Sequence, residues 1–220
     1  SCMPELRAMP HVLEKKWVLE GVIPGTGAIL KWFRDNFGQL EKDVAETVGV
    51  DAYNILEDEA EMVKPGADGL VIIPLFNFGK GSMHNLSFAH TRGHLVRAIM
   101  ECNGFGIRGL LEMISGMGIP IEELRIDGGG ARSKLWRQIQ ADITGKRVVV
   151  PQVEEAGGLG AAILACIGVK IVPTVEKAVE NMVKILEVRN PNQENKKIYD
   201  EMHPKFMSIL LSSYAEVSQS

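Results

Sequence analysis

Residues 127–148 read DGGGARSKLWRQIQADITGKRV, and this stretch decides the fold class of the chain. A short strand-like segment, LRID at 124–127, leads into three glycines, and the residues after them carry apolar side chains at helical spacing. A second strand-like run and a second helix of small residues follow, so that the predicted elements are strands at 124–127 and 147–150 and helices at 133–144 and 156–167. Because strands alternate with helices, we predict an α/β layer architecture.

The segments on either side extend this pattern. We predict strands at 16–23 and 69–75, and helices at 28–38, 53–63, 90–117, 174–188 and 194–212. The long helix at 90–117 carries a core-facing apolar stripe and contains Gly93, Gly104, Gly106 and Gly109. Glycines cost stability inside a helix, so they indicate close packing against another backbone, or a kink.

The triple glycine at 128–130 is the first candidate binding site. Glycines after a buried strand let a flat or anionic ligand lie against the main chain, and the next helix N-terminus offers unpaired N–H groups. This geometry suits a nucleotide. A purely structural turn, with Ser133 as an ordinary N-cap and Asp127 pinning the glycines, explains the same residues equally well.

Two further glycine-rich stretches are weaker candidates. Residues 154–162 open a second helix with small residues, which more often indicates close helix packing than ligand contact. Residues 25–27 open the helix at 28–38. Neither the stretch at 127–133 nor that at 154–162 has the spaced GxGxxG pattern with an acidic residue about 20 positions on, and the sequence has no GxxxxGK[ST] phosphate loop. The two commonest nucleotide folds are therefore excluded.

The sequence presents no nucleophile with a base and no metal site. His90 and His94 are spaced i, i+4 and could ligate a metal, but no third ligand accompanies them, which favours a capping or hydrogen-bonding role. Cys2, Cys102 and Cys166 have no metal-binding spacing and indicate free thiols in a reducing cytoplasm. We expect Cys102 and Cys166 to act as small buried hydrophobes.

Bulk composition limits the partners. The chain has 220 residues and 45% hydrophobic content, which suits one large domain. Its net charge of −4, without a basic run, argues against nucleic acid. No window is apolar enough to span a membrane, and no export signal is visible, so we expect a cytoplasmic protein. Met3 could be a start or an internal methionine.

The motif at 127–148 resembles the C-terminal signature of the FGGY carbohydrate kinases, close to the xylulokinase branch. The stretch EEAGGLGAAILA at 154–165 is similar to the next block of that family, at the expected distance. GAILKWFRD at 27–35 and the segment 90–101 fit in order. The resemblance covers essentially the whole chain.

The resemblance implies an RNase H-like, actin-like ATPase domain with a mixed sheet flanked by helices. It implies that residues 1–220 form the nucleotide-binding C-terminal domain, incomplete at its N-terminal edge, and that the sugar-binding N-terminal domain is absent. No catalytic residue is then expected in this chain. ATP with Mg²⁺ is the implied cofactor, held at two glycine-opened helices and at the first helix by Gly27, Lys31, Gly128, Gly129, Gly130, Ala131, Ser133 and Gly158.

The partners implied are the N-terminal kinase domain and, through it, a sugar, with a pentulose such as xylulose favoured. Residues 77–85 depart from the family pattern, and Glu101-Cys102 replaces its Glu-Gly. Two alternatives stay open: a truncated, non-catalytic binding module of the same fold, and an actin-like ATPase that is not a sugar kinase. Apolar surface normally covered by the missing half also permits a homodimer.

Overall fold

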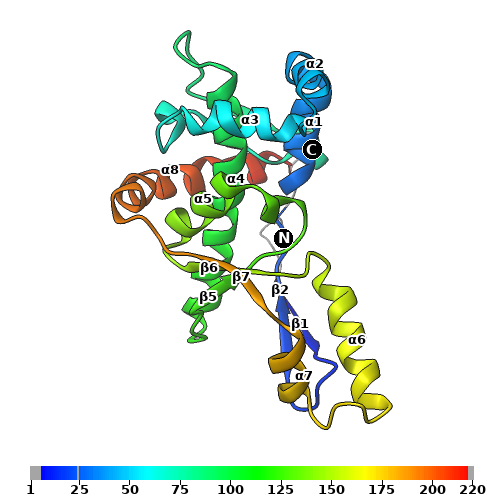
Figure 1. The fold of residues 1–220 in the computed structure, drawn as a ribbon. Helices are drawn as coiled ribbons and strands as arrows, with labels where there is room; N and C mark the ends of the chain where they lie inside the picture. The colour runs from blue at the N-terminus through cyan, green and yellow to red at the C-terminus, as the bar shows by residue number, and fades with distance from the viewer. Residues whose placement is uncertain (1–5, 24, 218–220) are drawn as a thin grey trace.

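The computed structural model describes residues 6–23 and 25–217 and centres on one long helix, α4 (Arg92–Gly116). Three helices pack around it: α3 (Ala52–Glu61), α5 (Lys134–Thr144) and α8 (Gln193–Val217) (Figure 1). Residues of α1 (Thr26–Phe37) and the buried strand β3 (Val71–Ile73) complete the main hydrophobic core. The expected helix at 90–117 and buried strand at 69–75 are confirmed.

The glycines of α4 are contact points between helices, as predicted. A Cβ on Gly93 would lie 2.3 Å from the carbonyl oxygen of Glu59 in α3. A Cβ on Gly104 would lie 2.7 Å from Ile143 in α5. Because these positions carry no side chain, α4 approaches its neighbours more closely than an alanine would allow.

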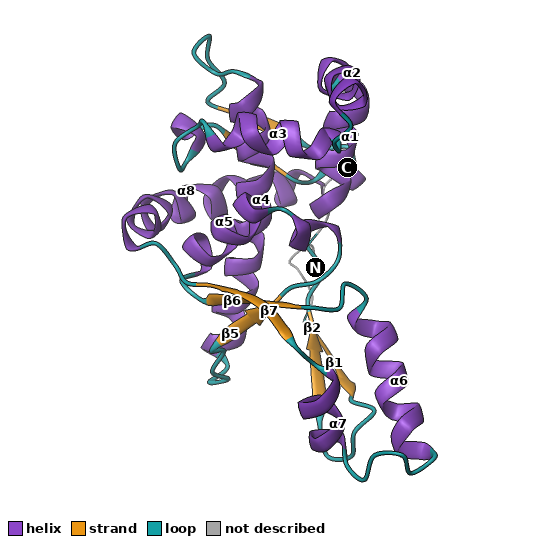
Figure 2. Cartoon of the chain, in the orientation of Figure 1, coloured by secondary structure: helices purple, strands orange, loops and turns teal. Residues whose placement is uncertain are grey.

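The strands form three small sheets rather than one (Figure 2). The strand β5 (Glu123–Arg125) runs parallel to β6 (Arg147–Pro151), and β7 (Ile185–Arg189) pairs with β6 in the antiparallel sense. Two antiparallel pairs are separate: β1 (Arg7–Pro10) with β2 (Trp17–Glu20), and β3 with β4 (Ser82–His84). The sheet that carries the glycine turn is mixed and borders helices, as expected.

The prediction of one helix over 174–188 is wrong in its second half. The helix α7 (Val175–Met182) begins after its N-cap Thr174, as expected, but Val183 is extended and the chain enters β7. Residues of β7 pair with Val148, Val149 and Val150, whose strand would otherwise lack a partner on that side. Hydrogen bonding to a distant strand therefore overrides the local helical pattern.

The other predicted elements are found near their expected places, and three are additional. The strand at 16–23, the helices at 28–38 and 53–63 and the helix at 194–212 correspond to β2, α1, α3 and α8. The strands β1 and β4 and the helix α2 (Gln39–Val48) were not predicted. Cys2, Met3 and Pro24 lie outside the described residues.

The helix α6 (Ala156–Gly168) packs on α7 and projects with it and with β1 and β2 away from the helical core (Figure 1). Of its residues only Ile163 is buried, and Leu164 is 38% exposed. Cys166 is half-buried rather than buried as expected, whereas Cys102 in α4 is buried. Burial raises the pKa of the Cys102 thiol to about 12, so it behaves as the apolar side chain that we predicted.

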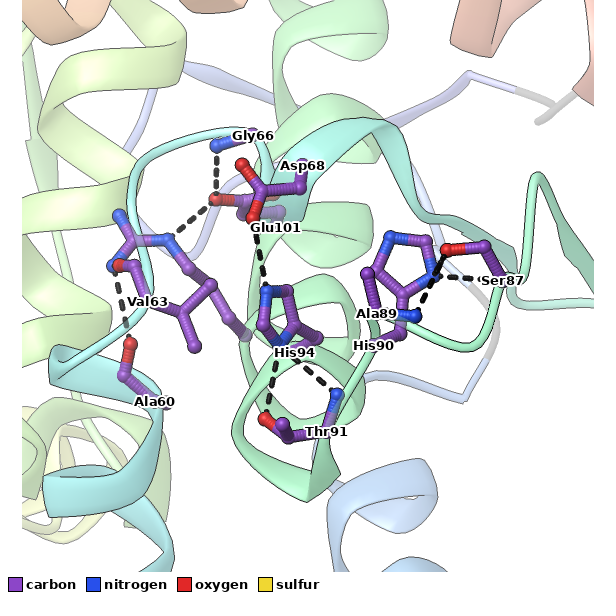
Figure 3. Close-up of polar contacts among 11 residues, drawn as sticks. Ala60, Val63, Gly66, Asp68, Ser87, Ala89, His90, Thr91, His94 and Glu101 are labelled. Atoms are coloured by element: carbon purple, nitrogen blue, oxygen red, sulfur yellow. Dashed lines mark hydrogen bonds and ion pairs between the residues drawn. The ribbon is translucent and has the colours of Figure 1, made fainter.

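A buried ion pair joins α4 to α8 and to the turn before β3. Arg97 Nε donates to Glu101 Oε1 at 2.8 Å, and the Tyr199 hydroxyl donates to the same oxygen at 2.8 Å. The backbone N–H of Gly66 donates to it as well, at 2.9 Å (Figure 3). This carboxylate holds a left-handed turn in which Ala67 and Asp68 have φ values of 43° and 49°. Such a backbone persists only where its surroundings fix it.

In the described part of the chain, none of the helices combines the length and the apolar character needed to cross a membrane.

Two glycines of α4 allow the close packing to be tested. Gly93→Ala should destabilise the protein by about 2–3 kcal/mol, because its methyl group meets the Glu59 carbonyl. Gly116→Ala should be neutral or stabilise by up to about 1 kcal/mol, because a Cβ there meets nothing within 4 Å. Urea unfolding of both variants measures the difference. Equal stability of the two variants would contradict the packing described.

A pair of carboxylates between α2 and α3 makes stability depend on pH. Burial, and then the neighbouring Glu41, raise the pKa of Glu59 above its ordinary value. The folded state therefore binds a proton more tightly than the unfolded state, so stability is fully present below pH ~4.5 and falls as pH rises through the raised pKa. Glu59→Gln should remove this loss and make the protein more stable at pH 7.

Unfolding in urea between pH 4 and pH 7.5 measures this effect, with Glu61→Gln on the exposed face of the same helix as the control. An unchanged slope of stability against pH in Glu59→Gln would show that the carboxylate pair has no such role.

Candidate functional site

A cavity of about 700 Å³ lies beside the glycine turn that the sequence singled out. The turn and β5 supply one wall, through residues 125–127 and 129–133. The helices α3, α4 and α5 supply others, and the end of β2 with the first turn of α1 closes the cavity through Gly21, Ile23, Gly27 and Leu30. Clefts and cavities of this size are typical of small-molecule sites.

The glycines of the turn have two different roles, one in backbone conformation and one in leaving space for a ligand. Gly128 has φ 74° and ψ −166°, a backbone conformation that L side chains rarely adopt, so it makes the turn possible. Gly129 needs no such freedom, but a Cβ on it would meet nothing within 4 Å. The absent side chain of Gly129 thus leaves room beside the main chain, and Gly129 and Gly130 both line the cavity.

The N-terminus of α5 offers fewer unpaired donors than we expected. Ser133 Oγ accepts the N–H of Trp136 at 2.9 Å, and Glu57 Oε1 accepts the N–H of Leu135 at 2.7 Å. The structural role of Ser133 as an N-cap is therefore confirmed, although Ser133 also lines the cavity. Since α3 supplies a carboxylate to this helix end, two of the first N–H groups are paired and the end is acidic.

The N-terminus of α1 differs in this respect. Gly25 is its N-cap, in the left-handed conformation, and the first turn holds no acidic residue. Among the described residues no side chain caps this end, and the internal hydrogen bonds begin with Ile29 N–H to Gly25 O at 3.0 Å. Gly27 faces the cavity with open space at its Cβ position. This end presents main-chain donors in a positive local field.

The structure brings five of the eight predicted nucleotide-binding residues together. Gly27, Gly129, Gly130, Ala131 and Ser133 all line the cavity. Gly128 adjoins it, and the other two lie elsewhere. Lys31 is exposed and its ammonium binds Asp35 Oδ2 at 2.5 Å, and Gly158 lies in the projecting helix α6.

Charged residues line the cavity. Asp51 and Glu57 reach the cavity from α3 and its N-cap, and Asp127 from the end of β5. Asp127 makes no hydrogen bond to the turn within the described residues, so the pinning role that we predicted for it is not seen. Arg125 and Arg132 also line the cavity, but Glu123 and Glu154 hold their guanidinium groups at 2.8 and 2.6 Å.

The wall formed by α3 was missed by the sequence analysis. Asp51, Tyr53, Asn54 and Glu57 line the cavity, although they lie more than 70 residues before the glycine turn. Tyr53 and Glu57 are spaced i, i+4, which places them on one face of the helix. That spacing was the only signal in the sequence, and it does not indicate which element the face meets.

Buried polar side chains form part of the cavity wall. Gln140 Nε2 donates to Asn103 Oδ1 at 3.0 Å, which joins α5 to α4 beneath the cavity. Gln140 Oε1 and Trp136 Nε1 are buried without a hydrogen-bond partner in the described part of the chain. Buried polar groups are normally paired, so these two atoms are exceptions within the packed wall of the cavity.

The histidine pair has the structural role that the sequence favoured (Figure 3). His94 Nδ1 accepts the N–H of Thr91 at 3.1 Å and forms a capping box at the start of α4. Its Nε2 contacts Asp68 Oδ2 at 3.1 Å, and His90 Nδ1 accepts the N–H of Ser87 at 3.0 Å. Residues 6–23 and 25–217 contain no group of three or more His, Cys, Asp or Glu side chains that could hold a metal ion.

Comparison with known proteins identifies the family. Residues 5–169 match the family model of the C-terminal domain of the FGGY family of carbohydrate kinases. The chain is 36% identical over 217 residues to autoinducer-2 kinase of Salmonella paratyphi A, covering 93% of this chain and 41% of that protein. It is 32% identical over 216 residues to gluconokinase of Bacillus licheniformis, covering 94% and 42% of the two chains.

The fold comparison agrees. The crystal structure of xylulose kinase from Rhodospirillum rubrum matches with a TM-score of 0.82 and 28% identity, over 98% of this chain and 43% of that one. The actin-like ATPase fold that we expected is thereby confirmed. The chain spans about two fifths of the length of the relatives that it matches. It belongs to the FGGY family of carbohydrate kinases, and its residues 5–169 correspond to the C-terminal domain of that family.

Proposed function

We propose that this chain is the ATP-binding half of a sugar kinase, which transfers the γ-phosphate of ATP to a sugar hydroxyl only when an N-terminal sugar-binding domain is joined to it. The observation that carries the proposal is the cavity that unites the family's glycine turn, Gly129 to Ser133, with the uncapped start of α1 at Gly27. Family membership favours a kinase over an actin-like ATPase of another kind.

The two ends of the cavity suit different parts of a nucleotide. Around the glycine turn, the carboxylates of Asp51, Glu57 and Asp127 would repel phosphates but can accept hydrogen bonds from ribose hydroxyls. At the other end, the main-chain N–H groups of the first turn of α1 suit anionic oxygens. We therefore infer that the nucleoside lies against the turn at 129–133 and that the phosphates extend toward Gly27.

Mg²⁺ would accompany ATP through the phosphate oxygens, as is usual for phosphoryl transfer. The base that takes the proton of the sugar hydroxyl, and most sugar contacts, would belong to the N-terminal domain. For the acceptor we propose a small polyhydroxylated substrate. A pentulose such as xylulose is one candidate, and the relatives named for gluconate and autoinducer-2 support wider testing. ATP-dependent sugar metabolism suits the cytoplasm, which we propose as its location.

Titration calorimetry with Mg·ADP tests the proposal directly. The 220-residue chain should bind Mg·ADP, and by itself should not phosphorylate xylulose or gluconate. Gly129→Val should weaken Mg·ADP binding at least tenfold, because its side chain would fill open cavity space without a clash in the protein. Gly160→Val is the matched control, since Gly160 also has open space but lies in α6, outside the cavity.

Absence of Mg·ADP binding by the folded wild-type chain would overturn the proposal. Sugar phosphorylation by this chain alone would overturn the proposal that catalysis requires the N-terminal domain. A parent protein without a preceding sugar-binding domain would instead favour the non-catalytic module. Sedimentation would test whether the chain forms a dimer.

Gly27→Asp tests the phosphate end. A carboxylate at the first turn of α1 suits the helix dipole, and a Cβ on Gly27 meets no atom within 4 Å, so stability should not fall. By charge repulsion it should nevertheless weaken binding of tripolyphosphate and of Mg·ADP at least tenfold. The affinity for adenosine should stay within about twofold of the wild-type value. Gly27→Asn adds a side chain of similar size without the charge and should have a much smaller effect. Equal losses for Asp and Asn would mean that size, not charge, governs this end.

A further inference from the structure

We propose that Tyr53 is the aromatic surface on which the base of the bound nucleotide stacks, and that Arg34 holds this ring from behind. The inference rests on the proposed function, because it assigns the base of that nucleotide to a particular side chain. It concerns a wall of the cavity that the glycine motifs do not include.

The first step is the position of Tyr53 relative to the glycine turn. Tyr53 lies in the first turn of α3, where its N–H donates to the N-cap Asp51 at 2.9 Å. Glu57, one turn later on the same face, accepts the N–H of Leu135 beside Ser133. The α3 face that carries both side chains is therefore docked against the start of α5, and both side chains line the cavity there.

The second step is the guanidinium group behind the ring. Arg34 Cζ lies 4.6 Å from the centroid of the Tyr53 ring, within the range of a cation–π contact. Asp35 Oδ1 accepts hydrogen bonds from Arg34 Nε at 2.8 Å and from Nη2 at 2.6 Å. Hydrogen bonding to Asp35 raises the pKa of Arg34 above its ordinary value, so the group stays charged. Since Arg34 does not line the cavity whereas Tyr53 does, we place the guanidinium on the face of the ring that points away from the cavity.

The third step is the choice of ligand. The aromatic side chains among the lining residues are Tyr53 and Trp136. Trp136 is only 5% exposed and lies under the turn, with its ring 3.7 Å from a Cβ built on Gly130. Tyr53 is half-buried and stands among carboxylates that suit ribose hydroxyls. A flat base is the part of a nucleotide that gains from an aromatic face, whichever base it is.

The fourth step is the spacing along α1. Arg34 lies seven residues after Gly27 in the same helix, which corresponds to about 10 Å of helical rise. One rigid element therefore carries the donors proposed for the phosphates and the support of the ring proposed for the base. This arrangement fixes the distance between the two ends of the ligand.

The experiment compares adenosine, which has no phosphates, with tripolyphosphate, which has no base. Tyr53→Leu should weaken adenosine binding about tenfold and leave tripolyphosphate binding within about twofold. Tyr53→Phe keeps the ring and should bind both ligands like the wild type. Arg34→Met keeps the aliphatic contact but removes the charge, and should weaken adenosine binding about threefold. The fluorescent analogue ethenoadenosine should be quenched when it binds the wild type and less so in Tyr53→Leu.

Adenosine binding by Tyr53→Leu at wild-type strength would overturn the inference and leave the proposed function intact. If Tyr53→Leu lost affinity for adenosine and for tripolyphosphate equally, the inference would be overturned as well, because a stacking surface cannot act on a ligand without a base. If the wild type bound none of the ligands, the proposed function itself would fail. Should Tyr53→Leu unfold, two other measurements decide the question: the adenosine affinity of Arg34→Met and the quenching of ethenoadenosine by the wild type and by Tyr53→Phe. The inference would be overturned if Arg34→Met bound adenosine like the wild type and neither the wild type nor Tyr53→Phe quenched ethenoadenosine.

Discussion

The close contacts of α4 at its glycines are the constraint on which the rest of the structure depends. Gly93 admits the backbone of α3, Gly104 admits Ile143 of α5, and a Cβ on Gly106 would lie 2.9 Å from Ile23 after β2. These three neighbours are also the elements that wall the cavity. A bulkier residue at any of these positions would displace a wall, so the glycines that lower helix propensity in α4 set the shape of the binding site.

Much of the fold could be predicted because its signals are local. The periodic stripe of α4 and the apolar run of β3 locate both elements to within about two residues. The prediction failed at 183–189, since β7 exists through its pairing with β6, and no local pattern encodes a distant strand. The charged helix α2 was missed for a similar reason: its buried Glu41 is paired with Arg92, some 50 residues away.

The candidate site was predictable to the same extent. The glycine turn is contiguous in sequence, so its residues could be named, and five of the eight proposed residues meet in one cavity. Tyr53 and Glu57 could not be assigned, because their helix face acquires a role only where α3 meets α5. The expectation of unpaired donors was wrong for Leu135 and Trp136 at the start of α5, whereas the start of α1, for which we had no such expectation, has no side-chain cap. The difference depends on Glu57, a carboxylate contributed by another helix.

The contrast between these two helix ends gives the proposed site a direction. If both ends were uncapped, a phosphate could bind at either, and the nucleotide would have no fixed orientation. Glu57 removes that ambiguity because it satisfies and acidifies the end beside the glycine turn. In the proposed site the phosphates would then point toward the start of α1, and that helix would set their distance from Tyr53. When one ligand occupies both ends, translational and rotational entropy is lost for one molecule, whereas adenosine and phosphate binding separately would each lose it. The geometry therefore favours an intact nucleotide over its parts.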